Sequence, residues 1–154
     1  MSNLEYLDHL PKIPEDLIED IHNTVNTGES YTSQGLTEAS SYQHFCSIAG
    51  SDKLKKFTKS LFAFEHETHI FVLSADLPVH MDNISVRDVA FNYVIQSGNG
   101  LTRFHKEKTN ESLYEDHVID THRWHKLDVS KFHSVTIPEP PRIVVTVSTL
   151  KERL

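Results

Sequence analysis

The sequence predicts an α+β protein that is mainly β, with an antiparallel sandwich or barrel and helices packed outside it. Short runs rich in β-branched and aromatic residues recur from residue 68 onwards, among them THIFVLSA (68–75) and RIVVTVST (142–149), and such runs favour strands. SGNG (97–100) and PEPP (138–141) stand between runs of this kind and act as turn signals. Two amphipathic segments precede the strands, and helices followed by many strands are typical of this class.

Two helices are expected, over residues 13–25 and 51–62. Pro14 suits the first turn of the earlier helix, where its missing N–H costs nothing. Ser51 is the expected N-cap of the later one. The apolar stripes that would face the core are Leu17, Ile18, Ile21 and Val25 in the first helix, and Leu54, Phe57 and Leu61 in the second.

Strands are expected over residues 68–75, 78–82, 87–97, 101–105, 133–137 and 141–149. Residues 106–124 are interpreted as a loop that follows the fourth of these strands. Residues 26–35 are interpreted as a polar loop after the first helix, and residues 37–49 fit no element clearly.

The composition is that of an ordinary globular chain of 154 residues, with 38% hydrophobic and 24% charged residues. We expect a single domain, residues 1–154, in which residues 1–63 form a helical support and residues 64–149 form the β core. A net charge of −7 argues against nucleic acid as the main partner, because phosphate binding needs a basic surface. The oligomeric state leaves no signal in the sequence.

The cellular location is predicted from what the sequence lacks. A single cysteine, Cys46, permits no internal disulfide, which favours a reducing compartment. The opening MSNLEYLDHL does not resemble a signal peptide, and no apolar run reaches the roughly 18 residues of a membrane span. We therefore expect a cytoplasmic protein without a membrane partner.

The stretch LPVHMDNISVR (77–87) raises the question of chemistry, because His80 stands two places before Asp82 in a run that reads as a strand. Side chains at positions i and i+2 of a strand share a face. On an exposed edge strand this pair would simply be solvated. Turned inward, the carboxylate must be satisfied, and a divalent metal would satisfy both groups if His133, in the distant run KFHSVTI, supplied a third ligand.

Arg142 adds a second signal. It begins the run RIVVTVS nine residues after His133, with the turn PEPP between them. If the two runs are neighbouring strands, Arg142 enters the same interior as His133. A buried guanidinium requires an anion, and a dicarboxylate could pair with it in bidentate fashion.

The ordered set His80-Met81-Asp82, His133 and Arg142, with Arg87 between them, resembles the Fe(II)- and 2-oxoglutarate-dependent dioxygenases. Within that superfamily it is similar to the small prolyl-hydroxylase-like branch, over about residues 64–149. The resemblance implies a double-stranded β-helix, a jelly-roll or cupin-like fold, with the metal between its two sheets.

The resemblance also implies roles for residues. His80, Asp82 and His133 would hold Fe(II), the metal that reacts with O2. 2-Oxoglutarate would chelate the iron, and Arg142 would bind its far carboxylate. Asn92 is the next expected cosubstrate contact, because positions 90, 92 and 94 should share a face. Tyr93 replaces it if the register is off by one.

The reaction expected from the resemblance is hydroxylation. The halogenases that resemble this pattern have a small residue where this chain keeps the carboxylate of Asp82. Two departures concern the cosubstrate contacts: Val144 stands where many members have a hydroxyl residue, and Gly98-Asn99-Gly100 replaces the common Gly-Gly.

Other interpretations remain open at this stage. The chain could be a cupin-like metal-binding protein that does not use 2-oxoglutarate, or a structural jelly roll in which the triad is coincidental. The substrate of an oxygenase, a small molecule or a protein side chain, has no motif here. The other candidates were given structural roles: His66 and His69 on a solvated edge, His105 before a loop, His122 and His125 on the surface beside a core Trp124, and Cys46 in a structural position.

Overall fold

The computed structural model describes residues 2–27, 45–82 and 87–149. The two expected helices are present, with small shifts at their ends. Helix α1 (Glu15–Thr27) buries Leu17, Ile21 and Val25. Helix α2 (Asp52–Leu61) begins after Ser51, whose side chain accepts a hydrogen bond from the backbone N–H of Leu54 at 3.2 Å, as expected of an N-cap.

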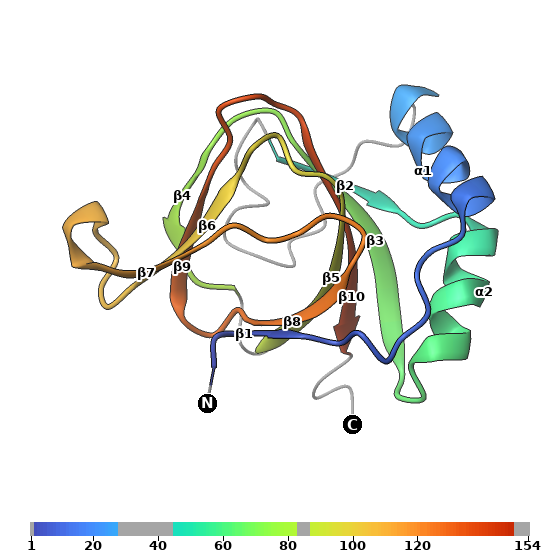
Figure 1. Cartoon of the computed structure of the whole chain (residues 1–154), viewed down its shortest axis with the longest axis horizontal. Coiled ribbons are helices and arrows are strands. Elements are labelled where there is room, and N and C mark those ends of the chain that lie inside the picture. Colours follow the sequence, from blue (N-terminus) through green and yellow to red (C-terminus); the bar gives the residue numbers. More distant parts are fainter. Residues whose placement is uncertain (1, 28–44, 83–86, 150–154) are drawn as a thin grey trace.

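Ten strands form two antiparallel sheets (Figure 1). The larger sheet has the order β1-β8-β5-β10-β3-β2 and the smaller one has the order β4-β9-β6-β7. Their bounds are β1 (Leu4–Tyr6), β2 (Phe45–Ala49), β3 (His66–Leu73), β4 (Leu77–His80), β5 (Val89–Gln96), β6 (Leu101–His105), β7 (Leu113–His117), β8 (Trp124–Asp128), β9 (Phe132–Thr136) and β10 (Arg142–Thr149).

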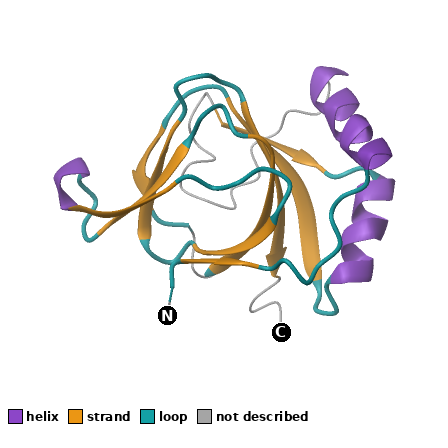
Figure 2. Ribbon diagram, in the orientation of Figure 1, coloured by secondary structure: helices purple, strands orange, loops and turns teal. Residues whose placement is uncertain are grey.

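Helices α1 and α2 lie together on one side of the β framework (Figure 2). Their buried side chains form one apolar cluster with the residues of the larger sheet that point away from the smaller sheet. Members of this cluster are Leu17, Ile21, Leu54, Ile70, Val72, Trp124 and Val145. The prediction of helices packed outside a β core is therefore confirmed.

The inner face of the larger sheet carries a row of four polar residues in register. Thr146 of β10 pairs with His69 of β3 on one side and with Asn92 of β5 on the other. Asn92 in turn pairs with His125 of β8. Because side chains alternate along each strand, Val144 and Ser148 share this inner face with Thr146, while Val145 faces the helices.

Two expectations about secondary structure were wrong. Residues 106–124 are not one loop: they contain a 3-10 turn, η2 (Asn110–Ser112), the strand β7 and the first residue of β8. β7 was missed because its residues, LYEDH, are mostly charged or polar, a composition that edge strands tolerate. The polar loop after the first helix was placed too early, because α1 runs to Thr27; residues 28–35 lie outside the described ranges.

The N-terminal third also adds strands that the sequence did not predict. β1, of three residues, pairs with β8, and β2, in the segment that fitted no element, pairs with β3. In the described ranges, no helix combines the length and the apolar character that a membrane span needs.

Candidate metal centre

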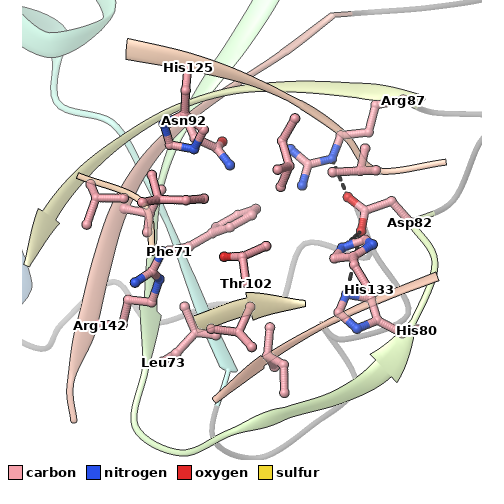
Figure 3. Close-up of a pocket in the computed structure, with 17 residues that line it drawn as sticks. Phe71, Leu73, His80, Asp82, Arg87, Asn92, Thr102, His125, His133 and Arg142 are labelled. Atoms are coloured by element: carbon pink, nitrogen blue, oxygen red, sulfur yellow. Dashed lines mark hydrogen bonds and ion pairs between the residues drawn. The ribbon is translucent and has the colours of Figure 1, made fainter. Parts of the chain in front are cut away.

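His80, Asp82 and His133 come together between the sheets. His80 ends β4 and is the register partner of His133 on β9, and Asp82 follows two residues after His80. Oδ1 of Asp82 lies 3.6 Å from Nε2 of His80 and 3.4 Å from Nε2 of His133. One ligand atom from each residue falls within 4.8 Å of the others, and all three residues are buried. Figure 3 shows them converging at one side of a cavity.

The orientation of the two imidazole rings fits a metal. Nδ1 of His80 lies 2.8 Å from the carbonyl oxygen of Pro78, and Nδ1 of His133 lies 2.7 Å from that of Lys131. A carbonyl oxygen only accepts, so each Nδ1 carries a proton and leaves Nε2, which faces Asp82, as the nitrogen that can bind a metal. Two Nε2 atoms and a carboxylate oxygen that face one another are a donor set that suits a divalent transition metal.

Asp82 is held as a carboxylate. Burial alone would raise the pKa of Asp82, but the charge of Arg87 and the contact with His133 outweigh it and lower the pKa to about 2. Nε of Arg87 donates to Oδ2 of Asp82 at 2.6 Å. The side chain is therefore ionised at neutral pH and presents its other oxygen, Oδ1, to the two histidines.

The cavity beside the triad is mostly apolar. Its walls include Phe71, Leu73, Leu77, Val94, Ile119, Leu127, Val129, Val135 and Val144, and its polar residues outside the triad are Arg87, Asn92, Thr102, His125 and Arg142. Thr102 lies between the triad and Arg142, which occupies the opposite side (Figure 3). A largely apolar site with few polar groups strengthens each electrostatic interaction made inside it.

Arg142 is a buried cation without a carboxylate partner among the described residues. It is 4% exposed, and Nη1 donates to the carbonyl oxygen of Ser97 at 2.9 Å. Burial lowers the pKa of Arg142 to about 10, so the group is charged at neutral pH. A Cβ on Gly100 would lie 2.6 Å from Nη1, which explains a glycine at this position. The remaining guanidinium donors suit an anion.

Asn92 lines the cavity and Tyr93 does not. The register that placed positions 90, 92 and 94 on one face is thus the correct one. Oδ1 of Asn92 is buried and has no hydrogen-bond partner among the described residues. Tyr93 faces the helices, where its hydroxyl accepts a hydrogen bond from the N–H of Ile13 at 3.3 Å. Tyr93 therefore does not line this cavity.

Two histidines assigned to the surface are buried inside the barrel. His125 is 1% exposed and lines the cavity beside Asn92; burial lowers its pKa to about 4, which keeps the ring neutral. His69 is 5% exposed and its ring stacks on Phe71. Period-2 alternation could have found both, because each stands two places before an apolar residue of the inner face, Leu127 or Phe71.

The other assignments had mixed outcomes. Trp124 is in the core and His122 is exposed, as expected. His66 is half-buried on the helix side, where its Nε2 lies 3.4 Å from Oγ1 of Thr58. His105 is on β6, buried, and paired with Ser134 at 2.8 Å outside the cavity. Cys46 is half-buried, packs against the helix-side cluster, and burial raises its pKa.

Comparisons with known proteins identify the fold. No family model matches the sequence, and no curated protein matches it. A prolyl hydroxylase from Trichoplax adhaerens, solved with a peptide of the hypoxia-inducible factor, aligns with a TM-score of 0.68 at 12% identity over 98% of this chain and 84% of its own. A prolyl-4-hydroxylase from Pseudomonas putida gives 0.61 at 13% identity, over 97% and 93%.

HygX from Streptomyces hygroscopicus, solved with nickel and 2-oxoglutarate bound, gives a TM-score of 0.60 at 8% identity, over 99% of this chain and 84% of its own. At such low identities the likeness establishes the architecture. The double-stranded β-helix that the resemblance implied is therefore confirmed.

Proposed function

We propose that this protein is an Fe(II)- and 2-oxoglutarate-dependent dioxygenase of the hydroxylase type. The observation that carries the proposal is the pairing, in one cavity, of a buried His80-Asp82-His133 triad with a buried Arg142 that has no carboxylate partner among the described residues. The triad calls for a cation and Arg142 calls for an anion. A metal chelated by a dicarboxylate answers both requirements at once.

His80, Asp82 and His133 would hold the iron, and their backbone and side-chain partners fix their orientation before the metal arrives. Arg142 would bind the far carboxylate of 2-oxoglutarate in bidentate fashion. When bound, the iron and the cosubstrate supply the oxidising chemistry from O2. The apolar walls of the cavity exclude water from that chemistry.

Asn92 is the second proposed contact to the cosubstrate. It stands on β5, whose neighbour β10 carries Arg142, and its side chain faces the cavity (Figure 3). Its amide can donate to a carboxylate or carbonyl oxygen of the ligand. Neutral His125 lies beside it in the same row.

The substrate proposed is a small molecule or a protein side chain. Because Asp82 supplies the carboxylate ligand, no position is vacated for a halide, and hydroxylation is the proposed outcome. The net charge of −7 disfavours nucleic acid as substrate. We propose a cytoplasmic location on the basis of the single cysteine.

An anaerobic titration tests the cofactor assignment. Fe(II) is added to the chelator-treated protein, then 2-oxoglutarate, and the visible metal-to-ligand charge-transfer band is recorded. We expect the band in the parent, its loss in Asp82→Ala, and its loss or marked weakening in Arg142→Ala. Arg103→Ala is a matched control, because Arg103 is half-buried in a surface pair with Asp116.

The outcomes separate the alternatives. Fe(II) binding without a band in the parent would exclude 2-oxoglutarate and select a cupin-like metal-binding protein. Absence of metal binding in the folded parent would overturn the proposal and make the triad a structural feature. Formation of succinate from 2-oxoglutarate under air, absent in both cavity variants, would confirm it.

A further inference from the structure

Arg87 is a second buried arginine at the cavity, and its role differs from that of Arg142. It stands two residues before β5 and is 3% exposed. Its guanidinium lies 5.4 Å from the ring centroid of Phe71, a cation–π contact on one face. Its Nε donates to Oδ2 of Asp82 at 2.6 Å, and both side chains are almost fully enclosed.

The far end of the same guanidinium is held by strand β10. Nη1 of Arg87 donates to Oγ1 of Thr146 at 3.0 Å and to Oγ of Ser148 at 2.8 Å. Thr146 and Ser148 lie two residues apart on the inner face and are 0% and 1% exposed. The planar group is thus fixed at Nε by the carboxylate and at Nη1 by two hydroxyls, and it lies over the ring of Phe71.

This arrangement gives the two oxygens of Asp82 different tasks. Oδ1 faces Nε2 of His80 and Nε2 of His133, whereas Oδ2 is occupied by Arg87. We propose that Arg87 is a positioning residue that restricts Asp82 to one metal-binding oxygen, Oδ1. The inference rests on the proposed function, because it concerns how the triad holds its metal.

The consequence is an open coordination position. A facial triad with one carboxylate oxygen leaves positions for a chelating cosubstrate and for O2. If Asp82 turned to bind through both oxygens, it would occupy a position that one of these ligands needs. A carboxylate near a divalent metal adopts either mode, so the selection must come from a competing partner of Oδ2, and Arg87 supplies one.

The shape of arginine is part of the inference. Nε and Nη1 of Arg87 point to opposite partners, Asp82 on one side and β10 on the other. Lysine has a single ammonium group and cannot reach both sets of partners in fixed directions. A residue that supplies only the positive charge would therefore not replace Arg87. This distinguishes a positioning role from a role that only neutralises the charge of Asp82.

Mn(II) provides the test because its binding is measured without turnover. The metal is titrated into the chelator-treated parent protein, into Arg87→Met and Arg87→Lys, and into Ser148→Ala. Electron paramagnetic resonance in ¹⁷O-enriched water then reports the number of water ligands on the bound Mn(II). Arg103→Met is the matched control, since it removes an arginine–aspartate pair at the surface, between β6 and β7.

We expect Mn(II) to bind about 10- to 100-fold more weakly in Arg87→Met, the usual effect of removing a partner of a metal ligand. The bound ion should carry one water ligand fewer than in the parent, because Asp82 then binds through both oxygens. Arg87→Lys should restore affinity in part but not the water count. Ser148→Ala should shift both readouts slightly in the same direction, and Arg103→Met should shift neither.

Two failures are distinguishable. If the folded parent binds no Mn(II), the proposed function fails and the inference fails with it. If the parent binds Mn(II) and Arg87→Lys and Ser148→Ala keep both the parent affinity and the parent water count, the inference is overturned while the proposed function stands. Should Arg87→Met not fold, as judged by circular dichroism, these two milder variants decide the matter.

Discussion

Arg87 and Arg142 are both buried at the same cavity, yet their surroundings are opposite. Arg87 has a carboxylate and two hydroxyls within hydrogen-bond distance. Arg142 donates only to a backbone carbonyl, that of Ser97, among the described residues. One cation is satisfied inside the protein, and the other has no anionic partner among the described residues. The same residue type therefore forms an internal ion pair at one end of the cavity and is the proposed ligand-binding group at the other.

This contrast follows from the elements that carry the two residues. Arg142 begins β10, where the adjacent turn supplies carbonyl oxygens but no acidic side chain within ion-pair distance. Arg87 precedes β5 and reaches the far half of β10, where Thr146 and Ser148 stand. A protein that retains an unpaired buried charge sacrifices stability, which is common at functional sites.

The largest expected effect comes from removing the carboxylate of Asp82, which is the charged partner of Arg87. In chelator-treated protein, Asp82→Ala should lower the free energy of unfolding by about 3–5 kcal/mol, because Arg87 remains buried without its counter-ion. Urea unfolding followed by circular dichroism measures the change. Asp82→Asn keeps an oxygen that can accept from Nε and should lose less. A loss below about 1 kcal/mol in Asp82→Ala would contradict the satisfied state assigned to Arg87.

The next effect concerns the pH dependence of stability that His125 causes at the end of the cavity where Asn92 and Arg142 lie. The pKa of His125 is lowered from 6.5 to about 4 by burial and, to a lesser degree, by the charges of Arg142 and Arg123. The folded state therefore resists protonation of this ring while the unfolded state accepts it. Stability should fall as pH drops below about 6.5, by about 3 kcal/mol when pH 4 is reached.

His125→Asn should remove the part of this acid sensitivity that His125 contributes, while His69 and His105, whose pKa values burial also lowers, keep their own parts. Unfolding free energies measured between pH 7 and pH 4 would detect the difference. Asp82, at the other end of the cavity, responds to pH differently. The lowered pKa of Asp82 gives a stabilisation that persists above about pH 4 and is lost only as pH falls from there towards 2. A parent whose stability is flat between pH 6.5 and 4 would contradict the buried, neutral state of His125.

The end of the cavity that holds Asn92, His125 and Arg142 was partly predictable from the sequence. Alternation along β5 placed Asn92 on the inner face, and the spacing of HxD, His133 and Arg142 indicated the metal and anion groups. His125 was missed because it directly follows residues 106–124, which were interpreted as a loop, so it was not placed on a strand with Leu127. That β8 pairs with β5 depends on the sheet order, which local patterns do not encode.

The contacts of Arg87 at the other end of the cavity were less predictable. Arg87 could be seen as part of an ordered motif, but its bonds to Thr146 and Ser148 join positions 59 and 61 residues apart. Contacts at such separation follow from the packing of two strands in three dimensions. The sequence predicted the fold class, the helices and the strands rich in β-branched residues. It did not predict the short strand β1 or the charged strand β7, because tertiary pairing overrides weak local preference.

Arg142→Met should act in the opposite direction to Asp82→Ala. It replaces an unpaired buried charge by an apolar side chain of similar length, and ligand-free protein should gain about 1 kcal/mol of stability. The carbonyl of Ser97 retains the N–H of Gly100 as a donor, at 3.0 Å. The same variant should no longer bind 2-oxoglutarate in a calorimetric titration. A clear loss of ligand-free stability would show that Arg142 has a structural role like that of Arg87.

The smallest effect sharpens the comparison with a third arginine. Nε of Arg103 donates to Oδ1 of Asp116 at 2.8 Å, close to the 2.6 Å of the Arg87–Asp82 bond, but the side chains of Arg103 and Asp116 are 32% and 45% exposed. Water screens such a pair, so Arg103→Met should change the free energy of unfolding by no more than about 0.5 kcal/mol.

A double-mutant cycle of Arg103→Met with Asp116→Asn, run beside the cycle of Arg87→Met with Asp82→Asn, measures the coupling energy of each pair. Similar coupling energies would mean that burial adds nothing to the Arg87–Asp82 pair. A much larger coupling is expected for Arg87 and Asp82, because the two bond lengths are similar while the Arg87–Asp82 pair is shielded from solvent.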